Sequence, residues 1–356
     1  MRRHATRAAV ALALAASLAA CSPTPSGPTM TAAEAADRVS SLGMGAGGVL
    51  ADPAVADLGQ ALDDIAPAGL PEGDGHQLPR GVYELDSESG TWVQVGDSDD
   101  LELDWTTDPD GLPAELLVDW DASGPTVTRT LAAGGQVELP TGANATLTVD
   151  GEVVVDLDQT GTWPENQCGT LTEPGDLYLD GQVTHGDATL VVDMVGFSVD
   201  AGEATATADG SGGLELTVPA GRAWVDWDAS LELDITRDEA TCEITDGKVT
   251  SGRLRVDAGV DAEDGEGSVG FATDFAPVTD PSTAETTGLA LTNGRLTIDG
   301  ELAVTWDGVL DDADGDGVPG ENLELTFEDG TMTLEEFIRE QFGLALLGSR
   351  VLGALR

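Results

Sequence analysis

Three aspartates at alternate positions form the motif whose spacing points most directly to chemistry. They lie in the run Asp312-Ala313-Asp314-Gly315-Asp316-Gly317, and Glu321 follows four residues later. Calcium binds roughly six to eight hard oxygen ligands, and glycine permits the tight turn that brings them around one point. The sequence therefore predicts a structural Ca²⁺ site formed by Asp312, Asp314, Asp316 and Glu321. The alternative is an acidic surface turn in an acidic protein.

This run resembles the first half of an EF-hand calcium loop. If Asp312 is the first position, the twelfth is Leu323 rather than the bidentate glutamate that the family uses. The flanking segments, Leu302–Trp306 and Leu323–Phe327, alternate like strands and not like the paired helices of an EF-hand. The resemblance therefore implies a shorter calcium loop between two strands.

Arrangements typical of enzymes are hard to find in the chain. After residue 20 only two histidines remain, His76 and His185, too few for a histidine-rich zinc site. There is no Gly-x-Ser-x-Gly elbow, phosphate-binding loop or dinucleotide fingerprint. Paired carboxylates for a hydrolase exist in abundance, because the chain has 66 acidic residues, and no pair stands out. We expect a protein that is not an enzyme.

Two cysteines in the body of the chain, Cys168 and Cys242, are candidates for a disulfide. In an exported protein disulfides persist, so we expect the two to pair. The alternative is two separate buried thiols. A bridge across so long a loop would contribute about 3–4 kcal/mol by restricting the unfolded chain.

Helices are predicted at both ends of the body. Thr31 and Glu34 form a capping box for a helix over 31–41, which the glycines of 43–48 should end. Asp52 caps a second helix that starts at Pro53. Thr333 and Glu336 form a further capping box, and an apolar stripe from Leu334 to Leu346 predicts an amphipathic helix packed on the sheet.

Strict alternation of apolar and acidic residues dominates the segments between these helices. Leu101-Glu102-Leu103-Asp104-Trp105 and Leu231-Glu232-Leu233-Asp234-Ile235 are examples. Such alternation buries one face and exposes the other, as in antiparallel sheets. Turn pairs recur about every 8–12 residues; those suited to tight hairpins are Asp150-Gly151, Asp180-Gly181, Asp246-Gly247, Asn293-Gly294 and Asp299-Gly300.

The fold class that follows is mainly β. We expect one large or two adjacent antiparallel sheets, as a sandwich or curved meander, with short N-terminal helices and a C-terminal amphipathic helix. One hexapeptide, Val118-Asp119-Trp120-Asp121-Ala122-Ser123, recurs at 225–230 without matching flanks. The predicted segments are a signal at 1–20, a tether at 21–30, helices at 31–72, a first β unit at 73–160, a second at 161–330 with the acidic loop at 311–322, and the final helix at 331–356.

The N-terminus has the layout of an export signal. A basic start containing Arg2, Arg3 and Arg7 precedes an apolar stretch too short to span a membrane, and Leu18-Ala19-Ala20-Cys21 ends it. This ending resembles the lipobox of bacterial lipoproteins. The resemblance implies cleavage before Cys21 and attachment of acyl chains such as palmitate to that cysteine. An ordinary secretory signal with a chance cysteine is the alternative.

Composition limits the partners. The 66 acidic and 15 basic residues give a net charge of −51, which becomes −54 once residues 1–20 and their three arginines are removed. Such a field repels nucleic acid and anionic headgroups and favours cations or basic partners. Self-repulsion also favours a monomer.

The sequence therefore predicts a lipoprotein of the cell envelope, in the periplasm or on the cell surface, that contacts its membrane through the lipid on Cys21. Its role would be structural or binding, with calcium as a stabilising ion. One alternative is a carrier of an apolar ligand or lipid with a half-barrel cavity. Another is a carbohydrate-binding module, which would need two or more exposed tryptophans on one face.

Overall fold

The structure, a computed structural model, describes most of the chain between residues 27 and 342. The gaps are 66–70, 72–77, 87–88, 108–110, 132–133, 166–167, 170–174, 239, 241, 264, 283–285 and 314–318. The predicted signal at 1–20, Cys21, Asp314 and Asp316 lie outside the described residues.

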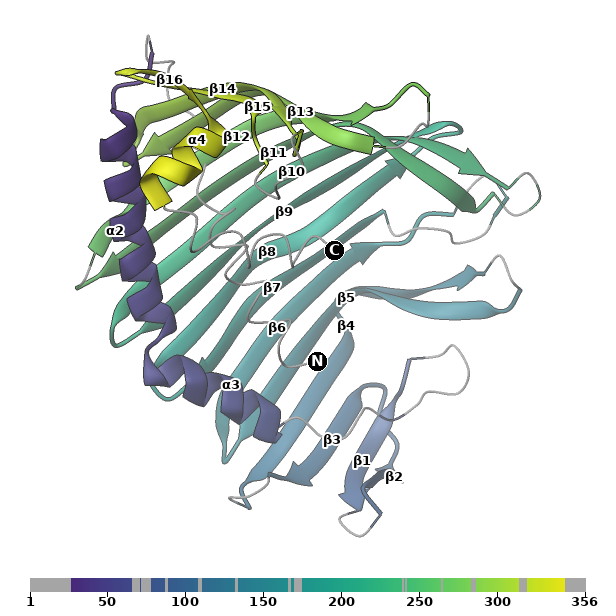
Figure 1. The fold of residues 1–356 in the computed structure, drawn as a ribbon. Helices are drawn as coiled ribbons and strands as arrows, with labels where there is room; N and C mark the ends of the chain where they lie inside the picture. The colour runs from purple at the N-terminus through teal and green to yellow at the C-terminus, as the bar shows by residue number, and fades with distance from the viewer. Residues whose placement is uncertain are drawn as a thin grey trace. The chain divides into compact units, whose positions relative to one another are not determined.

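Sixteen strands account for most of the described chain (Figure 1). They are β1 (Gly81–Asp86), β2 (Thr91–Gly96), β3 (Leu101–Thr106), β4 (Pro113–Thr130), β5 (Gln136–Val149), β6 (Glu152–Thr162), β7 (Asp176–His185), β8 (Ala188–Ala201), β9 (Thr205–Val218), β10 (Gly221–Arg237), β11 (Ile244–Ala262), β12 (Gly265–Thr279), β13 (Thr286–Ile298), β14 (Glu301–Leu310), β15 (Asn322–Phe327) and β16 (Gly330–Thr333).

All sixteen strands belong to one sheet that is not closed into a barrel, in the order β16 to β3 by sequence, then β1 and β2. Each strand from β3 to β9 and from β11 to β16 is antiparallel to the next, and β1 pairs with β3 in parallel. The mainly β fold is thus confirmed in its single-sheet form, as the alternating acidic and apolar residues predict.

Two of the five expected turns are present and the other three are wrong, among them Asp246-Gly247, which lies inside β11. Asp150-Gly151 and Asp299-Gly300 have positive φ at both residues, as tight primed hairpin turns require. Asn293-Gly294 instead lies inside β13 at a shift in register. The reason is packing, because a Cβ at residue 294 would collide with the indole of the buried Trp306. Asp180-Gly181 likewise lies inside β7, where a Cβ at 181 would collide with backbone of β6.

The N-terminal helices begin where the capping residues predict. α2 (Ala32–Leu50) follows Thr31, whose hydroxyl accepts the N–H of Glu34 at 3.2 Å while the Glu34 carboxylate accepts the N–H of Thr31 at 2.9 Å. α3 (Pro53–Ile65) follows Asp52, whose carboxylate accepts the N–H of Ala54 at 2.9 Å.

The expected end of α2 at its glycines is wrong, because the helix continues through all of them to Leu50. Gly45 explains why a glycine is useful there. A Cβ on Gly45 would lie 2.9 Å from the carbonyl oxygen of Gly265, at the turn between β11 and β12. The missing side chain lets the helix backbone approach the sheet, and packing therefore outweighs the low helix propensity of glycine.

Gly45 and Gly47 should respond oppositely to alanine. Gly47→Ala should stabilise the protein by about 1 kcal/mol, since no atom lies within 4 Å of the new Cβ and alanine favours the helix. Gly45→Ala should destabilise it by about 1–2 kcal/mol, because the new methyl group meets the Gly265 carbonyl. Urea unfolding of both variants measures the pair, and a stabilised Gly45→Ala protein would disprove the close approach.

The chain divides into two compact units. Unit 1 comprises Met1–Val49, Ala220–Asp234 and Lys248–Arg356, and unit 2 comprises Leu50–Pro219 and Ile235–Gly247. In unit 1, α2 packs on β12 to β15 around a core that includes Ile298 and Trp306. In unit 2, the core lies on β3 to β6. No helix in the described part of the chain is long and apolar enough to cross a membrane.

Residues near the start of the described chain are bound to strands near its end. The N–H and hydroxyl of Thr29 both donate to the carbonyl of Leu302 in β14, at 2.8 and 3.1 Å. The N–H of Glu328 donates to the carbonyl of Met30 at 2.9 Å, and Met30 is buried. Met30, close to the start of the described residues, is therefore part of the core of unit 1.

The second predicted capping box is also confirmed. Thr333 caps the short helix α4 (Leu334–Phe337), and its hydroxyl accepts the N–H of Glu336 at 3.1 Å. A π-helical turn, η1 (Ile338–Phe342), continues from it. Phe337 stacks on Phe327 of β15 with ring centroids 5.3 Å apart. The remainder of the predicted amphipathic stripe lies beyond residue 342, outside the described residues.

The predicted disulfide between Cys168 and Cys242 is confirmed, with an S–S distance of 2.01 Å and a Cα–Cα distance of 5.9 Å. Within unit 2 it joins the connection after β6 to the connection between β10 and β11. Arg237 supports the second of these connections, because its guanidinium donates to the carbonyl of Cys242 at 2.6 Å and to that of Gly202 at 3.0 Å.

Candidate functional site

The predicted calcium loop connects β14 to β15, two adjacent antiparallel strands, as the flanking alternation indicates. Asp311 closes the loop, since its carboxylate accepts both bonds from the amide of Asn322 at 3.0 and 3.1 Å. Of the four predicted ligands, Asp312 and Glu321 are described. The Glu321 carboxylate accepts the N–H of Ala313 at 3.3 Å, so it lies beside the first turn of the loop.

A second group of carboxylates, in unit 2, is one that sequence reasoning missed. Asp100, Asp119 and Asp121 each offer an oxygen, and these oxygens lie within 4.8 Å of one another. Asp119 and Asp121 occupy alternate positions of β4 and share a face, and Leu101 pairs with Val118, which places Asp100 beside them. Burial, followed by the charge of Asp119, raises the pKa of Asp100.

The recurring hexapeptide was the sequence signal that could have indicated this group. Only its first copy, at 118–123, contributes aspartates to the group. In the second copy Asp228 instead lies 3.4 Å from the guanidinium of Arg253, and Asp226 raises the pKa of Asp257. Identical residues thus have different neighbours, because pairing with other strands determines which charges meet.

Asp257, on β11 of unit 1, has a more strongly shifted pKa than Asp100. Burial raises its pKa to about 6, with the Asp226 charge adding to the shift and Arg295 and Arg255 opposing it. Arg255 and Arg295 both pair across the sheet with Ala272 of β12, so the two arginines flank that strand on the same face as Asp257.

This raised pKa predicts a pH effect of unusual sign. Unfolded aspartate titrates near 3.9, so the folded state binds a proton more tightly and Asp257 destabilises it at pH 7. That cost should disappear as the pH falls through about 6 towards 4. Asp257→Asn should therefore be more stable than wild type by about 1 kcal/mol at pH 7.5, after allowance for solvent screening, and by less at pH 5. Urea unfolding at both pH values measures this, and a pH-independent difference would contradict the raised pKa.

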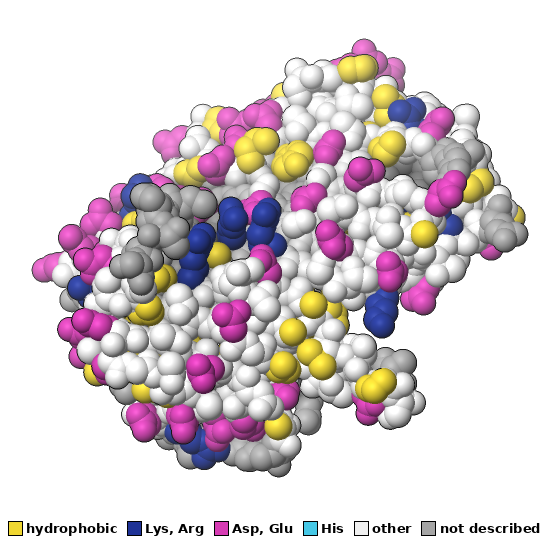
Figure 2. All heavy atoms as spheres, turned by 90° about the horizontal axis from the view of Figure 1, so that it is seen from above, with side chains coloured by type: hydrophobic (Ala, Val, Ile, Leu, Met, Phe, Trp, Pro, Cys, Tyr) yellow, Lys and Arg dark blue, Asp and Glu magenta, His cyan; other side chains and the backbone are white. Residues whose placement is uncertain are grey.

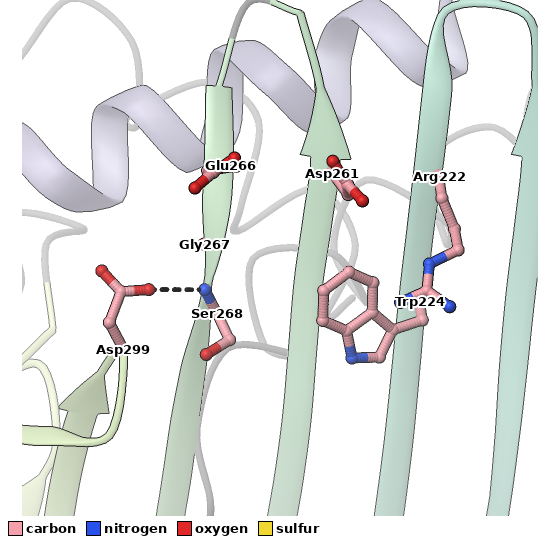
Figure 3. A pocket seen from close by; sticks show the side chains of 7 residues that line it. All are labelled: Arg222, Trp224, Asp261, Glu266, Gly267, Ser268 and Asp299. Carbon is pink, nitrogen blue, oxygen red and sulfur yellow. Dashed lines mark hydrogen bonds between the residues drawn. The ribbon is translucent and has the colours of Figure 1, made fainter.

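An open depression of about 540 Å³ lies on unit 1 between the ends of β10 to β13 (Figure 3). Trp224 lies over Gly259, where a Cβ would overlap its ring, and the guanidinium of Arg222 lies 4.8 Å from the ring centroid. The Asp299 carboxylate accepts the N–H of Ser268 at 2.9 Å. The remaining lining residues are Asp261, Glu266 and Gly267. The depression is thus polar and carries an aromatic ring whose face is already engaged.

The tryptophans do not meet the condition set for a carbohydrate-binding module. All seven are described, and none is exposed: Trp105 and Trp306 are buried and the others are half-buried. The indole N–H of Trp120 donates to the carbonyl of Pro79 at 2.9 Å, and that of Trp163 to the carbonyl of Pro140 at 2.6 Å. These rings act as packing anchors.

Negative charge is spread over the surface rather than confined to one site. Figure 2 shows acidic side chains distributed across the face in view, while basic side chains gather mainly in one group. Of the two histidines after residue 20, His185 is exposed at the turn between β7 and β8, and His76 lies outside the described residues. That the protein is not an enzyme remains a prediction.

Comparison with protein-family models, with curated proteins and with solved structures found no match to this chain. Its function must therefore be argued from its own residues.

Proposed function

We propose that the mature protein is a lipoprotein of the cell envelope, held to the extracytoplasmic side of a membrane by acyl chains on Cys21, with a non-enzymatic binding or structural role. The observation that carries this proposal is the run Leu18-Ala19-Ala20-Cys21, after a basic start and a short apolar stretch. The disulfide is consistent with a compartment outside the cytoplasm, where such bonds persist.

Mass spectrometry of the protein extracted from membranes tests the proposal. We expect an N-terminal peptide that begins at Cys21 and carries the mass of attached acyl chains. A mature protein that retains residues 1–20, or a Cys21 without lipid, would refute it.

An apolar region on unit 2 favours a carrier of apolar ligands as the second candidate. On β7, Leu177 and Leu179 share the face of Val183, which pairs with Val155 at the core. Leu177 pairs with Phe197 of β8, and Leu179 pairs with Val195. Phe197 is 39% exposed, and the other three are half-buried. We call Leu177, Leu179, Val195 and Phe197 the apolar patch.

The apolar patch differs from the other end of the same strands in how it is covered. α3 packs on β7 and β8, and Val183 and Val192 at that end are buried. The patch keeps partial access to solvent. A half-exposed apolar surface inside a sheet is the kind of surface that binds acyl chains or other apolar ligands.

Lipid that co-purifies with the protein tests the carrier. Solvent extraction and mass spectrometry should find lipid bound to the soluble form that lacks residues 1–21, and Phe197→Asp should lose it. Val153→Asp is the matched control, because Val153 is 55% exposed on β6 and lies outside the patch. No lipid in the wild type, or equal lipid in all three proteins, would refute the carrier.

With either function, a calcium ion would stabilise the protein by binding at the loop between β14 and β15. Its predicted ligands are Asp312, Asp314, Asp316 and Glu321, and Glu321 lies beside the start of the loop. Calorimetry with Ca²⁺ should show binding to the wild type and not to Asp314→Ala. Asp119→Ala serves as the control, because it removes one of the three carboxylates of the group in unit 2. No binding at millimolar calcium would refute the site. A binding heat that is absent only in Asp119→Ala would place the ion in unit 2.

A further inference from the structure

β2 is the last strand at one edge of the sheet. Among the described residues only β1 pairs with it, so its other side faces outward. Every other residue of such a strand directs its N–H and C=O groups away from the sheet, where they are able to pair with another chain. β2 reads Thr91-Trp92-Val93-Gln94-Val95-Gly96 and contains neither a charged residue nor proline.

The opposite edge has more protection than β2, whose one irregularity is a shift in register beside Val95. β16 has four residues and leads directly into α4 through the capping box of Thr333. Glu328 and Asp329 precede it. Short length, charge and a covering element are common ways in which proteins prevent pairing at a sheet edge. A six-residue uncharged edge is therefore exceptional in a chain with 66 acidic residues.

The edge is also held in a fixed position. Trp92 packs against the core of unit 2, and its ring meets that of Trp105 edge to face with centroids 6.0 Å apart. Val93 and Val95 are 48% and 52% exposed, and a shift in register leaves Val95 without a paired residue on β1. Because the strand is fixed by its inward tryptophan, a partner would not need to order it on binding.

A second copy of this chain does not suit the edge. Two copies would each bring a net charge of −51, and six residues of strand offer far less area than the roughly 1,200 Å² that small stable interfaces bury. A basic partner suits it better, because the exposed Asp97 and Asp99 follow the strand directly.

We infer that β2 binds an extended segment of another protein, which adds to the sheet as a seventeenth strand. That segment would carry apolar side chains at alternate positions, to meet Val93 and Val95, and lysine or arginine to match the acidic surroundings. This interaction is independent of the apolar patch and of the lipid on Cys21.

Two synthetic peptides test the inference. The first is a nine-residue peptide of alternating lysine and valine, and the second has the same sequence with N-methyl groups on alternate backbone nitrogens. The two carry equal charge, but only the first is able to pair as a strand. Titration calorimetry should show the first peptide binding at least about tenfold more tightly than the second.

Variants place the binding at β2. The double variant Val93→Ser/Val95→Ser should weaken the first peptide about fivefold or more, while Val153→Ser, an equally exposed valine on the interior strand β6, should leave it unchanged. If the double variant fails to fold, amide exchange of the wild type takes its place. The first peptide should then slow the exchange of amides in β2. Equal binding of both peptides, no binding, or a dimer in sedimentation that the double variant abolishes would each overturn the inference.

Discussion

Replacing Cys21 by serine should move the whole protein from the membrane to the soluble fraction. Acyl chains on Cys21 are the proposed anchor, and the rest of the mature chain gives little support for another. Its net charge of −54 repels the anionic headgroups that hold basic proteins to membranes. Within the described residues, no helix is long and apolar enough to span a bilayer.

Cell fractionation followed by an alkaline wash measures this effect. Wild type should stay with the membranes through the wash, and Cys21→Ser should appear entirely in the supernatant. Ser22→Ala, next to the same site, serves as a control that should remain bound. Membrane association of Cys21→Ser would reveal a second contact and refute the single anchor.

Removing the disulfide should lower the free energy of unfolding by about 3–4 kcal/mol. The bridge links cysteines 74 positions apart, and cutting it frees a long loop in the unfolded chain. Cys168→Ser/Cys242→Ser should therefore unfold at a markedly lower urea concentration than wild type. The bonds from Arg237 to the carbonyls of Cys242 and Gly202 would remain.

Reduction provides a matched comparison for the disulfide. Wild type in the presence of reductant should unfold at the same urea concentration as the double serine variant. The variant itself should not respond to reductant. An unchanged midpoint after removal of both cysteines would show that the unfolded chain gains little freedom.

Much of the fold was predictable because its main signal is local. An apolar residue followed by an acidic one, repeated along a segment, specifies both a strand and its buried face, as in Leu101 to Trp105. Helix caps act over two or three residues, and all three that the sequence shows, the capping boxes at Thr31 and Thr333 and the N-cap at Asp52, begin helices. These are interactions between near neighbours, so a sequence contains both partners side by side.

What could not be predicted depends on residues far apart in the sequence. Gly45 continues a helix because Gly265 lies against it, and Gly294 continues a strand because Trp306 covers it. From sequence alone, both glycines predict a break. The close approach of Asp100 to Asp119 has the same origin, since the pairing of β3 with β4 brings them together.

The candidate sites follow the same rule. A calcium loop was predictable as a hypothesis because its proposed ligands are neighbours in sequence, and Glu321 lies beside the first turn of that loop. The shifted pKa of Asp257 depends on burial and on Asp226 from another strand, and no local pattern indicates it. The open edge at β2 is likewise visible only once the strand order is known.

The bonds from Thr29 and Met30 to strands near the other end of the chain impose an order on folding. Most neighbouring strands are also neighbours in sequence, so hairpins are able to form one after another as the chain emerges. Met30 and α2, although they emerge early, gain their partners only when β14 and β15 arrive. The core of unit 1 therefore closes late, and until then the apolar side chains of Met30 and α2 stay exposed to solvent.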